Sequence, residues 1–305
     1  MRTGFVLSTA LAVLLLPASQ ALAQERIEKS LEAPIDGVVT VKNLRGQVVV
    51  EGWDREEVSL GADLEKRAEG LVFERDGKRT RVEVKLRENA SDSNGDAAMV
   101  IGGEGSKLVL KVPAGSRIEI EGVATDIDAR SVASLKVHTV SGDATVSEVK
   151  GGMDLKTVSG DILVGGSGPG GSRIKSASGD MKLDLSAREL QLSTVSGNLD
   201  VTLGEFDQLD ASAVSGNLKV SGALAREGRV ELATVSGDCN VQLRGTVDAR
   251  IVISTGPGGS ISNKLNAAKP EKHAVSGEHL ETTLGAGSGS VNVSTVTGTV
   301  NLRGE

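Results

Sequence analysis

Aromatic side chains are almost absent from this sequence: its 305 residues include three phenylalanines, one tryptophan and no tyrosine. Large rings usually fill the core of a globular protein of this length, and they form the stacking surfaces of sugar-binding subsites. Their scarcity argues against a conventional globular core and against a polysaccharide-processing enzyme. It favours a narrow core of Val, Leu, Ile and Ala.

Metal-binding and nucleophilic side chains are also scarce. The single cysteine, Cys239, cannot form an internal disulfide, and its place in an alternating apolar segment predicts a small buried side chain. His138 falls on the outward phase of its predicted strand, whereas His273 and His279 flank one corner with Glu278 between them. A zinc site usually needs three or four convergent ligands, so we expect solvated surface histidines and no metal centre there.

Two patterns that resemble active-site motifs have simpler structural explanations. Residues 166–171 (GSGPGG) match the letters of a dinucleotide-binding G-x-G-x-x-G motif, but a strand, not a helix, is expected to follow at Ile174. Asp126 and Asp128 share one strand face and are the candidate carboxylate pair of the alternative function, a polysaccharide-active β-helix enzyme. Nothing basic or aromatic is arranged around them, so we expect no enzyme activity.

Long apolar runs are missing after the N-terminus. Arg2 precedes an apolar run over residues 5–16 and then Ala21, Leu22 and Ala23, which predicts a secretory signal peptide at residues 1–23. A membrane-spanning helix needs about 20 apolar residues, so the mature chain is expected to have no transmembrane segment. Export to the periplasm is the expected outcome, with the cell surface or secretion as the alternative.

The charge balance is acidic, with 34 Lys and Arg against 41 Asp and Glu. Nucleic-acid binding needs clustered basic residues, so nucleic acid is not an expected partner. The expected partner is an envelope protein or a surface glycan.

What the sequence does contain is a repeat. Its copies are residues 139–143 and 157–161 (TVSGD), 176–180 (SASGD), 194–198 (TVSGN), 213–217 (AVSGN) and 234–238 (TVSGD). Their glycines are Gly142, Gly160, Gly179, Gly197, Gly216 and Gly237, spaced by 18, 19, 18, 19 and 21 residues. Weaker copies follow at residues 274–277 and 295–298. A fixed period near 20 residues is typical of a solenoid.

Strict alternation of apolar and polar residues surrounds each copy. Leu190 and Leu192 before one corner, and Leu199 and Val201 after it, would lie on one buried face. The corner glycine supplies positive φ or close backbone approach, and its Ser and Asp neighbours can bond local amides. We therefore predict an all-β fold, a β-helix-like solenoid with rungs of 18–21 residues and negligible helix.

The rhythm differs upstream. Strands are still expected within residues 24–115, but without the repeated corner, and a solenoid needs an atypical end to cover its open strand edge. The predicted organisation is a signal peptide at 1–23, an N-terminal β cap at 24–115 and a solenoid domain at 116–305. Residues 251–260 carry Gly-Pro-Gly-Gly in place of a corner motif, which predicts an irregular rung.

The chain resembles a known bacterial family. Residues 43–58 (NLRGQVVVEGWDREEV), residues 110–114 (LKVPA) and the repeated TVSGD corner are similar to the putative-adhesin family called domain of unknown function 4097. The resemblance covers nearly the whole mature chain, and it implies a β-strand-repeat envelope or surface protein without catalytic residues. A non-enzymatic binding, scaffolding or adhesin-like module that presents a rigid solenoid face is the expected function.

The corner aspartates form the candidate site. In stacked rungs Asp143, Asp161, Asp180 and Asp238 would form a ladder with a spacing of about 4.8 Å, interrupted by asparagines. Like charges at that spacing repel by about 1 kcal/mol in water. The first interpretation is that each carboxylate bonds backbone amides or hydroxyls; the other is a divalent-cation ladder, with calcium as the candidate cofactor.

Overall fold

The computed structural model describes residues 26–87, 105–168, 170–273 and 277–304. No helix occurs in these residues, so none of them forms a helix that could cross a membrane. The predicted signal peptide and most of the weak repeat at 274–277 lie outside the described residues. The strands are β1 (Ile27–Glu32), β2 (Val38–Trp53), β3 (Glu57–Asp63), β4 (Ala68–Asp76), β5 (Arg79–Leu86), β6 (Ser106–Pro113), β7 (Arg117–Arg130), β8 (Ser134–His138), β9 (Ala144–Ser147), β10 (Met153–Lys156), β11 (Ile162–Ser167), β12 (Ser172–Lys175), β13 (Met181–Leu185), β14 (Glu189–Ser196), β15 (Leu199–Ser215), β16 (Leu218–Ser236), β17 (Cys239–Leu243), β18 (Ala249–Lys264), β19 (Glu271–His273), β20 (Gly277–Leu284) and β21 (Gly289–Gly304).

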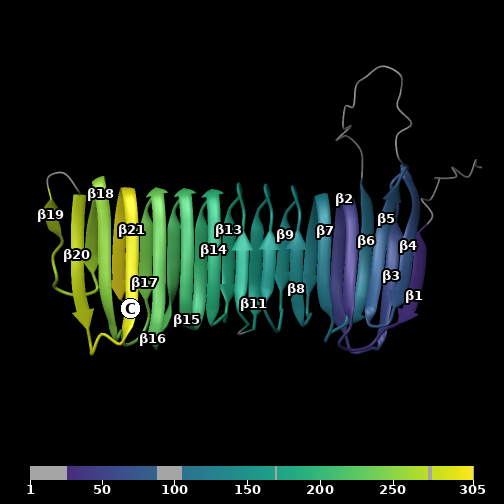
Figure 1. Cartoon of the computed structure of the whole chain (residues 1–305), viewed down its shortest axis with the longest axis horizontal. Helices are drawn as coiled ribbons and strands as arrows, with labels where there is room; N and C mark the ends of the chain where they lie inside the picture. The colour runs from purple at the N-terminus through teal and green to yellow at the C-terminus, as the bar shows by residue number, and fades with distance from the viewer. Residues whose placement is uncertain (1–25, 88–104, 169, 274–276, 305) are drawn as a thin grey trace, which may run out of the picture.

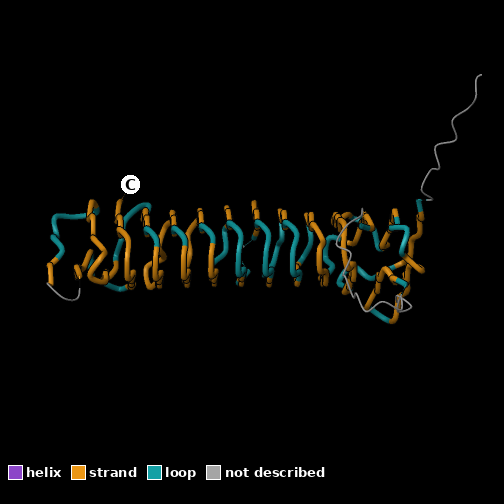
Figure 2. The backbone as a smooth tube through the Cα atoms, turned by 90° about the horizontal axis from the view of Figure 1, so that it is seen from above, coloured by secondary structure: helices purple, strands orange, loops and turns teal. Residues whose placement is uncertain are grey.

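Consecutive repeats stack in parallel, and each repeat places one strand in each of two facing layers. The first layer runs through β8, β10, β12 and β14, and the second runs through β9, β11, β13 and the start of β15. Figures 1 and 2 show the result as a straight rod of evenly spaced rungs. The predicted all-β repeat architecture is thus confirmed in outline, because the solenoid-like stacking follows the repeat period.

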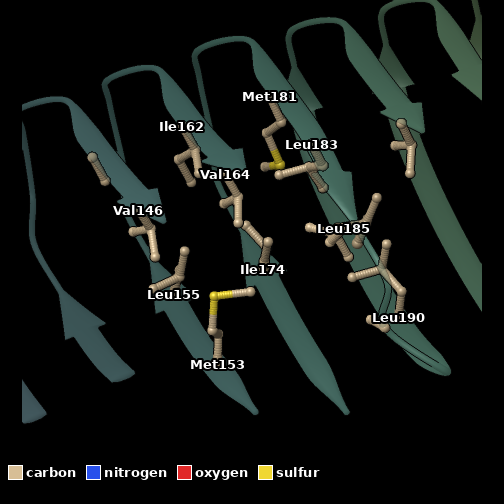
Figure 3. Close-up of a cluster of buried hydrophobic side chains, with 14 of the residues drawn as sticks. Val146, Met153, Leu155, Ile162, Val164, Ile174, Met181, Leu183, Leu185 and Leu190 are labelled. Carbon is tan, nitrogen blue, oxygen red and sulfur yellow. The ribbon is translucent and has the colours of Figure 1, made fainter. Parts of the chain in front are cut away.

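The core is a thin apolar layer between the two strand layers. Val146, Ile162 and Val164 point inward from one layer, and Met153 and Leu155 from the other, all at most 3% exposed. Figure 3 shows these side chains meeting in the middle of the rod. Because alternate residues face opposite sides of a strand, the period-2 pattern alone decides which side chains enter this layer. Phe206, which is fully buried, is the one large ring among the described core residues.

The C-terminal strand does not take its place in sequence order. The two halves of β21 pair in parallel with β16 and with β17 on one side, and β21 pairs with β18 on the other. The weak repeat at 295–298 therefore stacks directly on the repeat at 234–237, and β18 lies one rung further out. The irregular rung expected at residues 251–260 is present as a register shift between Thr255 and Gly258.

The two ends of the rod finish with antiparallel strands. At the N-terminal end β3 pairs with β6, β1 with β3 and β4 with β5, all antiparallel. At the other end β20 pairs with β18, and β19 with β20, also antiparallel. Within the predicted cap, β2 pairs in parallel with β7, so rung stacking continues across the expected boundary at residue 115. That boundary stays a prediction.

Cys239 gives a direct test of this packing. Its side chain is completely buried in β17, and burial raises the pKa of the thiol to about 12, with a smaller contribution from Asp238. A thiol that stays protonated and inaccessible does not attack disulfides. We expect no reaction of the folded chain with a disulfide reagent at neutral pH, and one equivalent of reaction after unfolding. A Val158→Cys variant, whose site is 52% exposed, should react at once; equal rates at the two sites would contradict the buried position.

Candidate functional site

The repeated corner is built on glycines that no other residue can replace without strain. The predicted corner glycines have φ between +119° at Gly142 and +150° at Gly216. A Cβ atom on Gly160 would lie 2.2 Å from the carbonyl oxygen of Gly142, and Gly179 has the same relation to Gly160. Both reasons for glycine, positive φ and close approach of stacked backbones, thus apply at these corners.

The first residue of the corner motif is turned inward. Thr139, Thr194 and Thr234 are at most 7% exposed. The Thr139 hydroxyl donates to the carbonyl oxygen of Ser141 at 2.9 Å, and the Ser176 hydroxyl donates to that of Ser178 at the same distance. Such a bond satisfies a polar group that would otherwise be costly to bury. This hydrogen bond stabilises the corner on its inner side, and the side chain of the next residue faces outward.

That next residue forms an exposed apolar row along the rod. The row, which we call the corner row, consists of Leu44, Val123, Val140, Val158, Ala177, Val195, Val214, Val235 and Val296. Apart from Ala177, these side chains are between 37% and 52% exposed, which makes them most of the exposed large hydrophobic residues of the described chain. Parallel pairing of the flanking residues, such as Thr194 with Ala213 and Ser196 with Ser215, keeps the row in register. Exposed apolar residues gathered into one strip are a common feature of interaction surfaces, so the corner row is the candidate site of this chain.

The sequence contained a signal for the corner row. Thr194 continues the inward phase of Leu190 and Leu192, so Val195 falls on the outward phase, where a polar residue is expected. Sequence reasoning assigned the corner to glycine, serine and aspartate and missed both the buried threonine and the exposed valine. The phase of the alternation, carried through the corner, would have found them.

The aspartates lie beside the corner row. Their side-chain oxygens accept hydrogen bonds from backbone amides of the next rung, and these bonds form a continuous ladder along the rod. Oδ1 of Asp143 accepts the amide of Asp161 at 2.9 Å, and Oδ1 of Asp161 accepts that of Asp180 at 2.8 Å. The ladder begins at Asp126, passes through Asn198 and Asn217, and ends where Oδ1 of Asp238 accepts the amide of Thr299 at 2.7 Å. These contacts match the first interpretation of the ladder. Calcium binding stays a prediction, and no group of three or more metal-ligating side chains is present in the described residues.

The last position of the corner motif is Asp in some repeats and Asn in others, and this alternation gives a matched test. Asp161→Ala removes the acceptor for the Asp180 amide and should lower the melting temperature by roughly 2 °C. Asp161→Asn retains an oxygen acceptor at Oδ1, as Asn198 and Asn217 do, and should melt at the native temperature or slightly above it. Thermal unfolding followed by circular dichroism separates the two variants. If alanine and asparagine melt alike, the amide bond has no role in stability.

The remaining candidate residues are not brought together. His138 faces outward from β8 but is half-buried, and its Nε2 atom is shielded from solvent without a hydrogen-bond partner, so it is not the fully solvated histidine that the sequence predicted. The Nδ1 atom of His279 is 3.1 Å from the hydroxyl of Ser254. Glu278 accepts the Ile261 amide at 2.8 Å and bonds Lys272, and these two contacts lower the pKa of its carboxyl group. Asp126 belongs to the amide ladder, and Asp128 has no hydrogen bond to it.

The other sequence candidates also have structural roles. The glycine-rich segment at 166–171 leads from β11 into β12, a strand, so it lacks the helix that a dinucleotide site needs. The indole nitrogen of Trp53 donates to the carbonyl oxygen of Glu57 at 2.8 Å, and the Arg55 guanidinium lies 4.9 Å from the ring centre. Trp53 is thus held at the end of β2 and stacks on a cation of its own chain.

Comparison with known proteins gives the family. The chain matches the family described as Toastrack DUF4097 over residues 39–303. It belongs to that family. No curated protein matches the chain.

Solved structures similar to this Toastrack chain share little sequence with it. A "putative adhesin" from Bacteroides fragilis is 9% identical, with 92% of this chain and 98% of that chain covered and a TM-score of 0.42. A "putative lipid binding protein" from Parabacteroides distasonis is 11% identical, covers 92% and 97%, and has a TM-score of 0.35. A "putative cell adhesion protein" from Clostridium sporogenes is 13% identical, covers 92% and 100%, and has a TM-score of 0.20.

Proposed function

We propose that this chain is a non-enzymatic binding rod of the cell envelope, exported to the periplasm or the cell surface, that holds its partner along the corner row. The partner class is an envelope protein or a surface glycan. The observation that carries the proposal is the row itself, an apolar strip that recurs at each corner from Leu44 to Val296 on a rigid stack of rungs. A binding surface of this kind needs regular spacing and rigidity, not a catalytic cluster.

The antiparallel strands at the N-terminal end fit the capping role expected of residues 24–115. β3 lies outside β6, and β1 lies outside β3. Strands added in antiparallel orientation interrupt the parallel stacking pattern and so protect the rod from end-to-end addition of further rungs. We infer that this cap keeps binding on the long side of the rod.

In-cell photocrosslinking tests the proposed surface. A photoreactive amino acid at Val195 or Val214 in the full chain should give a reproducible crosslinked product with one envelope component, identified by mass spectrometry. The same amino acid at Ile35, which is 57% exposed and lies outside the corner row, is the control. Crosslinking at Ile35 as strong as at the corner row, or none at either site, would overturn the assignment of this surface.

A further inference from the structure

We propose that the partner of the corner row is a second copy of this chain, and that the two rods lie side by side, parallel and in register. The inference rests on the proposed function, because it names what the corner row binds. The apolar residues of the row repeat once per rung, at about 4.8 Å. A surface that matches this spacing over the whole row must have the same repeat, and another corner row has it.

The polar residues on the two sides of the corner row are complementary in charge. Two positions before the row stand His138, Lys156 and Lys175, and three positions after it, in the same rungs, stand Asp143, Asp161 and Asp180. In the next two rungs, one side carries Ser193 and Ser212 and the other carries Asn198 and Asn217. In these five rungs basic residues on one side thus accompany acidic residues on the other, and neutral residues accompany neutral ones. Three other rungs depart from the pattern: that of Leu44 has Lys42 and Gln47, that of Val123 has Glu121 and Asp126, and that of Val235 has Ala233 and Asp238. In the rung of Val123, Lys42 of the adjoining rung bonds Glu121 at 2.8 Å.

Several of these charges have no opposite charge to bind within the described chain. Asp143, Asp161 and Asp180 form no ion pair, and neither does Lys175; Lys156 contacts only Asp154, at 3.4 Å. The three carboxylates line a shallow hollow of about 490 Å3 together with Leu163 and Lys182. Like charges stacked at the rung spacing repel each other, so a cation that enters this hollow would be favourable. The lysines of a second copy have the required spacing.

Symmetry selects the orientation of the two copies. A two-fold axis that runs along the rod keeps both rods parallel and places the basic side of each copy against the acidic side of the other. If the rods were antiparallel, the two acidic sides would lie next to each other, and so would the two basic sides. The straightness of the rod allows contact along its whole length (Figure 1). Because the strip is narrow compared with the roughly 800 Å2 per partner of a standard interface, we expect a dimer with micromolar affinity.

Sedimentation measures the pairing. The purified chain should change from monomer to dimer between about 1 and 100 μM, and the double variant Val158→Asp/Val195→Asp should stay monomeric. Ile35→Asp adds a charge at an exposed apolar position outside both the row and the hollow and should dimerise like the native chain. Equal melting temperatures of the variants exclude misfolding as the cause. A native chain that stays monomeric, or an Ile35→Asp variant that loses the dimer as well, would overturn the proposal.

Engineered cysteines distinguish the orientation and separate this proposal from the proposed function. In the parallel, in-register dimer each row position lies beside the same position of the other copy. Leu44→Cys and Val296→Cys, at the two ends of the row, should therefore each form a disulfide-linked homodimer on mild oxidation. If the rods are antiparallel, only a mixture of the two variants crosslinks, which would overturn the parallel arrangement. The buried Cys239 does not interfere. If the purified chain is monomeric but Val195 still captures another envelope component in cells, the proposed function stands and the second copy is excluded.

Discussion

Replacing Gly160 with alanine is expected to destabilise the protein by roughly 3 kcal/mol or more. Two costs combine at this position: φ is +130°, where a side chain is strained, and the new Cβ atom would lie 2.2 Å from the carbonyl oxygen of Gly142. That oxygen belongs to the stacked backbone, so it cannot move aside without shifting the neighbouring rung. Equilibrium unfolding in urea measures the change in the free energy of unfolding.

Gly165 provides the control within the same rung. A Cβ atom added there meets no heavy atom within 4 Å, and its φ is outside the strained region. Gly165→Ala should therefore change the free energy of unfolding by less than about 0.5 kcal/mol. If the two alanine variants unfold at the same urea concentration, stacked corner backbones are not what requires glycine at the repeat.

Removing β21 is expected to affect the middle of the C-terminal third and not only its end. A chain that stops at residue 286 loses the strand between β17 and β18, and with it Val291, Val293, Val300 and Leu302, all at most 2% exposed. The lost burial corresponds to roughly 8 kcal/mol. Hydrogen exchange should show loss of amide protection over residues 218–264, whereas the rungs of β8 to β13 keep theirs.

A point substitution keeps this test independent of truncation. Val293→Asp places a carboxylate in the core at a 2% exposed position and should produce the same local loss of protection. Asn292→Asp changes the adjacent, exposed side chain of the same strand and should leave the protection as it is. Unchanged protection of β17 and β18 in the truncated chain would show that these two strands stack directly on each other, in sequence order.

Local sequence rules predict how the repeats stack in the middle of the rod, but they do not predict the strand pairing at either end. Between residues 134 and 203 each repeat stacks on the one before it, because short turns leave consecutive repeats only one neighbouring place to go. β2 and β21 each pair with a strand far from them in sequence, and the period alone gives no indication of such pairings. The candidate site shows the same division: the ladder aspartates were found from the repeat, whereas Val195 and its equivalents were missed.

The sequence by itself determined the class of fold, the buried and exposed phases of each strand, the positions of the corner glycines and the alignment of the aspartates. These features are local or repeat at a fixed period, so one copy of the motif specifies all of them. Only the tertiary structure decided the order of rungs at the ends, the burial of the corner threonines and the exposure of the corner row as one strip. Those features depend on which strands become neighbours, and loop connections that span many residues allow more than one answer until the packed chain selects among them.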